Sequence, residues 1–329
     1  MTNAYQLTAI KLRYKQQLAL DIPELNIPSG KSIALLGENG AGKSSLLKLL
    51  AFTIKAEQGA VTLFGQTITP PINAVQRQKI GFVEQHPYLL PGSVESNLKL
   101  ALKLQGVPTE KHGQFIHYAL EQTQTTHLAQ KDSNSLSGGE LKRVAIARAI
   151  VYQPDILLLD EPFSHLDQRH LKLLEELILT ISQQENKTII FSSHDRLQGI
   201  AIADETINLV SGKMTESPLL NLFHGQLKQQ RFETGKISIH TTSSQIDTQH
   251  IAIDPHQIII SNEPLQSSMC NSFIGRITLI AEESATIRLT VDCGEPFHAI
   301  ISPESLSRLS LSLGKTVYLS FKATAVSLF

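Results

Sequence analysis

Short apolar runs alternate with amphipathic helical patterns along the first two thirds of the chain. Runs rich in aliphatic and β-branched residues predict buried strands at residues 31–37, 79–85, 155–162, 188–195 and 205–213. Between them, apolar residues recur at helical spacing in the segments GKSSLLKLLAF, GELKRVAIARAIVYQ and RHLKLLEELILTISQQ. Strands that are apolar throughout and alternate with helices are typical of a mostly parallel sheet covered on both faces. The pattern therefore predicts an α/β domain.

The pattern changes at two places. Residues 92–130 show helical rather than strand spacing, which predicts a helical insertion and places a helical subdomain at about 86–150. After about residue 228, turn-forming residues separate short alternating segments at 236–242, 250–261, 273–282, 285–292, 297–302 and 316–326. We therefore expect two domains, an α/β domain at 1–228 and a small all-β domain at 229–329, with strand spacing that suits a barrel better than a sandwich.

Composition and charge restrict the possible partners. The 329 residues carry a formal net charge of -1, which gives no global field for nucleic acid or anionic lipid. Cys270 and Cys293 are too few for a disulfide framework and lack metal-ligand spacing, so a reducing compartment is expected. The N-terminal residues do not resemble a secretory signal, and the aliphatic runs are far shorter than the ~20 residues of a membrane helix. Any membrane role is expected to come through a partner.

A glycine-rich segment, GENGAGKSS, follows one predicted strand and precedes a helix. Gly37 and Gly42 bracket four residues, and Lys43 and Ser44 come next, which is the spacing of a phosphate-binding loop. Such a loop points backbone N–H groups and a helix N-terminus at phosphate oxygens, while the lysine supplies a cation and the serine a hydroxyl for Mg²⁺. The segment predicts a nucleotide site that binds Mg²⁺.

Two acidic residues end the predicted strand ILLLDEP. Asp160 is placed to hold Mg²⁺ through its water shell, and Glu161 to polarise an attacking water. The alternative is two exposed acids after a strand. With the phosphate loop upstream, the pair predicts phosphoryl transfer to water.

Several motifs occur in a defined order: Gly37 to Ser45, Gln85 in GFVEQHP, LSGGE at 136–140, LLLDEP at 157–162, SHLD at 164–167 and His194 in SSHD. Together they resemble the ATP-binding subunit of ABC transporters over roughly residues 1–228. The resemblance implies a P-loop NTPase fold and a homodimer in which ATP lies between the phosphate loop of one copy and the signature of the other. The signature residues are Ser137, Gly138, Gly139 and Glu140. At a helix N-terminus they form an anion-binding cap that has nothing to hold within one copy.

The same resemblance implies roles for individual side chains. It assigns ATP binding to Tyr14, which would stack on adenine, and to Gly37, Asn39, Gly40, Gly42, Lys43, Ser44 and Ser45. It assigns catalysis to Glu161, Gln85 and His194, and Mg²⁺ to Ser44, Gln85 and, through water, Asp160. Asp167 would link the two halves of the dimer, next to His165, which departs from the usual alanine of the family. The alternatives are a turn tyrosine at Tyr14 and a solvated loop glutamine at Gln85.

The C-terminal segment at about 267–329 resembles the Mop-like (TOBE) domain of importer ATPases for oxyanions. The match is closest at FIGRI (273–277), ISPESL (301–306) and FKATAV (321–326), and it implies an OB-like fold and a molybdate or tungstate importer. Convergent donors for an oxyanion would be Ser268, Asn271, Lys322 and Thr324. The arginine usual in this family stretch is missing, so a purely structural barrel is the alternative.

These resemblances imply an ATPase that powers oxyanion import from the cytoplasmic face of the cell membrane. Its expected partners are membrane permease subunits, an extracytoplasmic substrate-binding protein and a second copy of the chain, with no nucleic acid. Residues 86–98 offer apolar side chains to the permease. The alternatives are an importer for sulfate, ferric ion or another substrate, and a soluble ABC ATPase acting on ribosomes or DNA.

Overall fold

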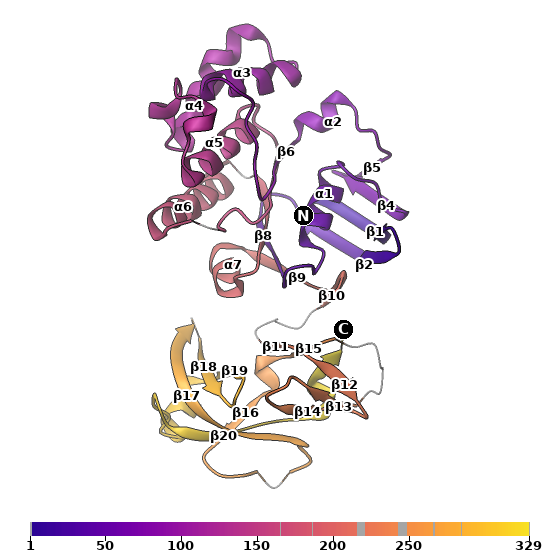
Figure 1. The fold of residues 1–329 in the computed structure, drawn as a ribbon, viewed down its shortest axis with the longest axis vertical. Coiled ribbons are helices and arrows are strands. Elements are labelled where there is room, and N and C mark those ends of the chain that lie inside the picture. The colour runs from indigo at the N-terminus through magenta and orange to yellow at the C-terminus, as the bar shows by residue number, and fades with distance from the viewer. Residues whose placement is uncertain are drawn as a thin grey trace. The chain divides into compact units, whose positions relative to one another are not determined.

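The chain divides into two compact units, Met1–Met214 and Thr215–Phe329, in a computed structural model (Figure 1). The structure describes residues 2–164, 166–185, 187–215, 221–242, 249–265, 267–283 and 285–328. The expected boundary at residue 228 is too late. Residues 221–228 pair with strands of the second unit, since β11 (Asn221–His224) pairs with β15 (His250–Ile253) and β12 (Gln226–Lys228) with β13 (Arg231–Glu233).

Unit 1 is built on a ten-stranded sheet in the order β5-β4-β1-β2-β10-β9-β3-β8-β7-β6. The five predicted strands form a continuous parallel block within it: β3 (Ser32–Leu36), β6 (Ile80–Val83), β7 (Ile156–Leu159), β8 (Thr188–Ser193) and β9 (Glu205–Val210). Their carboxyl ends meet at one edge, where the predicted motifs follow. The prediction of an α/β domain is confirmed.

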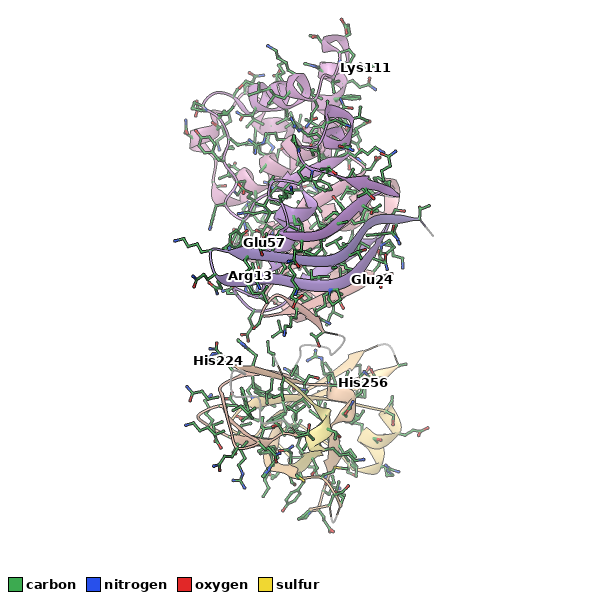
Figure 2. The ribbon with its side chains drawn as sticks, turned by 90° about the vertical axis from the view of Figure 1, so that its right-hand side faces the viewer. Arg13, Glu24, Glu57, Lys111, His224 and His256 are labelled. Carbon is green, nitrogen blue, oxygen red and sulfur yellow. The ribbon has the colours of Figure 1, made fainter. Side chains whose placement is uncertain are left out.

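The rest of the sheet was not predicted. It consists of β1 (Asn3–Tyr14), β2 (Gln17–Pro28), β4 (Gln58–Leu63) and β5 (Gln66–Ile68), which pair antiparallel, and of β10 (Lys213–Thr215), which pairs parallel with β2. The alternation of β1 is interrupted near Ala9, whose φ is 52° and where the register with β4 shifts. The side chains of Arg13 and Glu57, labelled in Figure 2, form an ion pair at 3.5 Å beside these strands.

Helices cover the sheet. They are α1 (Lys43–Leu50), α2 (Ala74–Gln78), α3 (Val94–Leu104), α4 (His112–Gln122), α5 (Gly138–Ile150), α6 (Gln168–Glu185) and α7 (Arg196–Ile202), with 3₁₀ turns at Thr109–Lys111, Thr126–Leu128 and Ser133–Ser135. Helices α3, α4 and α5 lie in sequence between β6 and β7 and form the predicted helical insertion (Figure 1). Within the described ranges, no helix combines the length and apolar character that crossing a membrane requires.

The parallel strands separate two apolar cores. Leu157 and Leu159 pack into a cluster that includes residues of α3 to α6, whereas Ile156 and Leu158 pack into a cluster that includes α1. All four side chains are fully buried. Burial on both faces explains why this strand is apolar at every position.

The described residues of unit 2 form β-strands, short helical turns and the loops between them. Its sheets have the orders β16-β20-β17-β18-β19, β11-β15-β21 and β12-β13-β14. The remaining bounds are β14 (Ser238–His240), β16 (Ile259–Ser261), β17 (Asn271–Glu283), β18 (Thr286–Asp292), β19 (Pro296–Ile301), β20 (Thr316–Phe321) and β21 (Val326–Leu328), with α8 at Pro303–Arg308 and 3₁₀ turns at Pro255–Gln257 and Ala323–Ala325. One apolar core, which includes Phe232, Phe297 and Phe321, serves all three sheets.

Two buried asparagines join these sheets in the same way. The Asn221 amide donates to the His298 carbonyl at 2.8 Å and accepts from its N–H at 2.6 Å. The Asn271 amide donates to the His240 carbonyl at 3.0 Å and accepts from its N–H at 2.7 Å. The asparagines begin similar segments, NLFHGQL and NSFIGRI. Unit 2 thus contains two similar segments, and each holds the backbone of a strand outside its own sheet.

Candidate nucleotide site

A cavity of about 460 Å³ opens at the carboxyl end of β3. Its lining includes most of the predicted nucleotide residues: Tyr14, Asn39, Gly40, Gly42, Lys43, Ser44, Ser45, Gln85 and Glu161. It also includes four residues that sequence analysis missed: Gln17, Leu18, Ala19 and Glu38. The first three directly follow the turn after Tyr14, so their closeness to that residue was the available signal. The structure therefore brings the turn between β1 and β2, the phosphate loop, the Gln85 loop and the end of β7 to one site.

The phosphate loop begins at Gly37, where β3 ends. A Cβ atom there would lie 2.4 Å from the Leu209 carbonyl oxygen of β9, so only glycine fits. The chain then turns into α1, whose first residue, Lys43, is 5% exposed. Its ammonium donates to the carbonyl oxygens of Gly37 at 2.8 Å and Glu38 at 3.1 Å. A helix N-terminus and a buried ammonium at one loop form a site for phosphate.

Oxygen donors for a cation lie beside this loop. The Ser44 hydroxyl donates to Asp160 Oδ1 at 3.0 Å, and the Ser192 hydroxyl of β8 donates to the same oxygen at 2.7 Å. Asp160 is 4% exposed, and Gln85 lines the same cavity as Ser44. A hydroxyl, a carboxylate and an amide carbonyl are hard oxygen ligands, which fit Mg²⁺ that retains waters and binds phosphate.

The backbone of Glu161 is held in a conformation that side chains disfavour. Its φ is 45°, in the left-handed region. Its N–H donates to the Ser192 hydroxyl at 2.7 Å, and its carbonyl accepts from the Ser164 hydroxyl at 2.9 Å and from the Lys142 ammonium at 3.3 Å. Ser192 and Lys142 were not predicted, because they meet Glu161 only in the fold. Strained backbone that is held by several bonds is typical of functional sites.

The carboxylate of Glu161 lies between two cationic or protonatable groups. Its Oε2 is bonded to His194 Nδ1 at 2.8 Å, and its Oε1 is 3.4 Å from the Lys43 ammonium. The carboxylate is 8% exposed, whereas the imidazole is 59% exposed. The structure thus brings Glu161 and His194 together, with one oxygen aimed at the phosphate loop.

The signature residues form the N-terminus of α5. The Ser137 hydroxyl accepts from the Glu140 N–H at 3.4 Å, and the Glu140 carboxylate accepts from the Ser137 N–H at 2.8 Å and from Lys131 at 3.0 Å. The bond from the Ser137 backbone, followed by the Lys131 bond, lowers the pKa of Glu140 to about 2. Ser137 and Gly138 are exposed, and none of the four signature residues lines the phosphate-loop cavity of its own chain.

Gly139 lies beside His170, which is bonded to Asp167. A Cβ atom on Gly139 would lie 2.7 Å from the His170 ring, so a larger residue there would force the ring to shift. The Asp167 carboxylate accepts from the His170 N–H at 2.9 Å and is bonded to His170 Nδ1 at 2.9 Å. These bonds, the backbone one first, lower the pKa of Asp167. The expected dimer link is therefore bonded within its own chain, and His165 lies outside the described residues.

The expected oxyanion donors differ in burial. Both polar groups of the Asn271 amide are bonded to the His240 backbone, and the residue is 1% exposed. Ser268, Lys322 and Thr324 are exposed. The expectation for Asn271 is corrected, because its amide is buried and is bonded to the backbone of a strand in another sheet.

Comparison with known families and proteins matches both parts of the chain. The ABC transporter family model matches residues 20–164, and the TOBE domain model matches residues 267–328. The sulfate/thiosulfate import ATP-binding protein of Thermosynechococcus vestitus is 31% identical over 309 residues, which cover 90% of each chain. The molybdate/tungstate import ATP-binding protein of Pyrococcus horikoshii is 28% identical over 338 residues, which cover 95% of each chain.

A solved ATP-binding cassette is similar in structure as well. It is dimeric, in a post-hydrolysis state, and bound to ADP and phosphate. The TM-score is 0.59 at 27% identity, and the alignment covers 64% of this chain and 97% of that chain. The fold of the cassette is therefore shared.

Proposed function

Because the chain belongs to the ATP-binding subunits of ABC importers and carries a C-terminal TOBE domain, we propose that it powers the uptake of molybdate or tungstate. The chain is an ATPase of the ABC type. The observation that carries its chemistry is the cavity in which Lys43, Ser44 and Glu161 meet. The choice of cargo is supported by the match to a molybdate/tungstate import protein over 95% of both chains.

Sulfate is the second candidate cargo. The sulfate/thiosulfate relative is 31% identical, against 28% for the molybdate/tungstate relative. Both relatives import tetrahedral oxyanions by name, so an oxyanion is the part of the proposal that they share. Asn271 adds nothing to either choice, because its amide joins two sheets.

ATP binds with its phosphates on the loop from Gly37 to Ser45 and its adenine against Tyr14. Lys43 lies at the N-terminus of α1, where its charge and the backbone N–H groups favour an anion. Tyr14 is 48% exposed at the cavity, as a stacking platform requires. Ser44, Gln85 and, through water, Asp160 would hold Mg²⁺, which would neutralise charge on the phosphates.

Hydrolysis uses Glu161 as the general base. Its carboxylate accepts a proton from the attacking water, and His194, bonded to it at 2.8 Å, contacts the γ-phosphate and orients the carboxylate. Gln85 orients the same water from the opposite loop. Lys43 stabilises the negative charge that spreads over the phosphate oxygens in the transition state.

The signature acts on the nucleotide of a second copy. The support is that Ser137 and Gly138 are exposed at the start of a helix and lie outside their own chain's cavity. An exposed helix N-terminus favours an anion, and the γ-phosphate of the partner is one. Asp167 lies at the same face and links the two copies. The similar solved cassette is dimeric.

A permease segment docks on the helical insertion. A groove of about 230 Å³ lies beside Leu90, Leu100, Leu104 and Tyr152. Leu104 is 74% exposed, and so much exposed apolar surface is typical of an interaction site. This contact holds the chain at the cytoplasmic face of the membrane, and an extracytoplasmic binding protein delivers the cargo.

The test is ATP hydrolysis by the complete transporter in lipid vesicles. The ATPase is purified with its permease, and the binding protein is supplied with molybdate, tungstate, sulfate or no ion. Stimulation by molybdate and tungstate but not sulfate is the expected result. Stimulation by sulfate alone would show that sulfate is the cargo instead of molybdate or tungstate. Co-purification with ribosomes or DNA instead of a permease would overturn the transport function.

A further inference from the structure

A lysine of the signature helix reaches the turn that carries Glu161. Lys142 lies in the second turn of α5, and its ammonium donates to the carbonyl oxygens of Glu161 at 3.3 Å and Pro162 at 3.2 Å. It also donates to the carbonyl and, at 2.9 Å, the hydroxyl of Ser164. This one side chain therefore bonds three residues of the turn from a helix outside it.

We propose that Lys142 is a positioning residue for hydrolysis, which holds the Glu161 carboxylate of its own chain in place from the signature helix. The proposal rests on the proposed roles of Glu161 and of the signature. Lys142 is not a catalytic residue, because it bonds backbone carbonyls and a hydroxyl rather than the carboxylate. It acts by fixing the turn from which the carboxylate projects.

The strain at Glu161 explains why the turn needs support. A φ of 45° is disfavoured for a residue with a Cβ atom, so the turn persists only when surrounding bonds hold it. Ser192 holds its N–H from β8, and Ser164 holds its carbonyl from within the turn. The bonds of Lys142 hold this turn from α5. Loss of Lys142 would leave the carbonyl side of the turn with local support alone.

The contacts of Lys142 also account for its burial. Burial lowers the pKa of the Lys142 ammonium, and the Glu161 charge opposes this effect. An ammonium removed from water is tolerated when carbonyl and hydroxyl oxygens replace the lost hydration. Because α5 begins at the signature, a shift of its N-terminus on engaging nucleotide would be transmitted to the Glu161 turn through this side chain.

The first test compares two substitutions of Lys142 in the full-length protein. Lys142→Met keeps the length of the side chain and removes its donors, so kcat for ATP should fall on the order of tenfold to a hundredfold. The KM for ATP and equilibrium binding of a non-hydrolysable ATP analogue should stay within about twofold. Lys142→Arg should recover part of the rate, because a guanidinium also donates to carbonyls.

A matched control is Lys99→Met. Lys99 is 56% exposed on α3, where it pairs with Glu95. Its substitution by methionine should therefore leave ATP hydrolysis unchanged. An unchanged kcat in Lys142→Met would overturn the proposal. So would a parallel loss of analogue binding and kcat, because that result describes a general packing defect.

The second test uses mixed dimers with two affinity tags, which separate the two sites. In one dimer, Lys142→Met and Glu161→Gln are in different subunits, so the remaining carboxylate belongs to the Lys142→Met subunit. In the other dimer, both changes are in one subunit, and the remaining carboxylate belongs to the unchanged chain. The proposal expects a low rate in the first dimer and, in the second, the rate of a dimer with Glu161→Gln alone.

Equal rates in the two mixed dimers would overturn the proposal, because Lys142 would then act without regard to its own Glu161. Failure of the proposed function gives a different result. In that case the unchanged protein itself would fail to dimerise with ATP, or Glu161→Gln would hydrolyse ATP at the normal rate.

Discussion

The phosphate loop and the signature both place small residues at a helix N-terminus, but they differ in burial and in their surroundings. At the phosphate loop, Lys43 is 5% exposed and lies 3.4 Å from Glu161 in a cavity that other loops help to line. At the signature, Ser137 bonds Glu140 in a capping box and is itself exposed. The first is an enclosed site and the second an outward-facing cap. The difference is what the proposed dimer requires, in which each chain supplies two unlike halves of a shared site.

The largest effect is expected from a substitution that removes the general base beside the phosphate loop. Glu161→Gln removes the carboxylate that accepts a proton, so ATP hydrolysis should fall by about 10²–10⁴-fold, while ATP still binds the loop. Turnover and equilibrium ATP binding are measured on the same preparation. Normal turnover would remove Glu161 from the role of general base.

Alanine substitutions at the two signature glycines test how closely this turn is packed. Gly139→Ala should destabilise the fold by about 1–3 kcal/mol, because its Cβ would lie 2.7 Å from the His170 ring. Gly138→Ala is the matched control, because nothing lies within 4 Å of a Cβ there, and it should be neutral or slightly stabilising. Urea unfolding of both variants gives the two free energies. Equal losses would show that the His170 contact does not define this turn.

The smallest expected effect depends on pH. The pKa of Glu140 is lowered to about 2, so its stabilisation is complete above the ordinary glutamate pKa and is lost as the pH falls towards 2. Glu140→Gln should therefore reduce the free energy of unfolding by roughly 1 kcal/mol at pH 7, with a smaller difference at pH 3. Urea unfolding at several pH values measures this. A difference that does not change with pH would exclude the charge as its cause.

The same comparison separates what the sequence could predict from what it could not. The phosphate loop and the signature are runs of consecutive residues, so motif spacing indicated Gly37 and Lys43, and the resemblance to a known family indicated Ser137. Lys142 was not predicted, because its partners lie about twenty residues away and meet it only in the fold. The antiparallel strand β1 was missed because its alternation is interrupted near Ala9, where its register with β4 shifts.

In unit 2, by contrast, a sequence motif predicted a ligand-binding role for a residue whose amide is bonded to the backbone of another strand. Asn271 belongs to a segment that resembles an oxyanion-binding stretch, and an exposed amide there would have been a reasonable donor. Its amide bonds the His240 backbone, which lies 31 residues earlier in the chain. Only the packing of the two sheets reveals that this amide is already used.

Ser137→Arg tests the shared site most directly. The added side chain would project from the exposed cap towards the partner's nucleotide, while the phosphate loop of its own chain stays intact. We expect ATP binding to the monomer within about twofold of normal, with ATP-dependent dimerisation and hydrolysis lost. Size-exclusion chromatography with ATP, in a Glu161→Gln background, measures the dimer. A Ser137→Arg protein that dimerises and, with Glu161 restored, hydrolyses ATP normally would contradict the account.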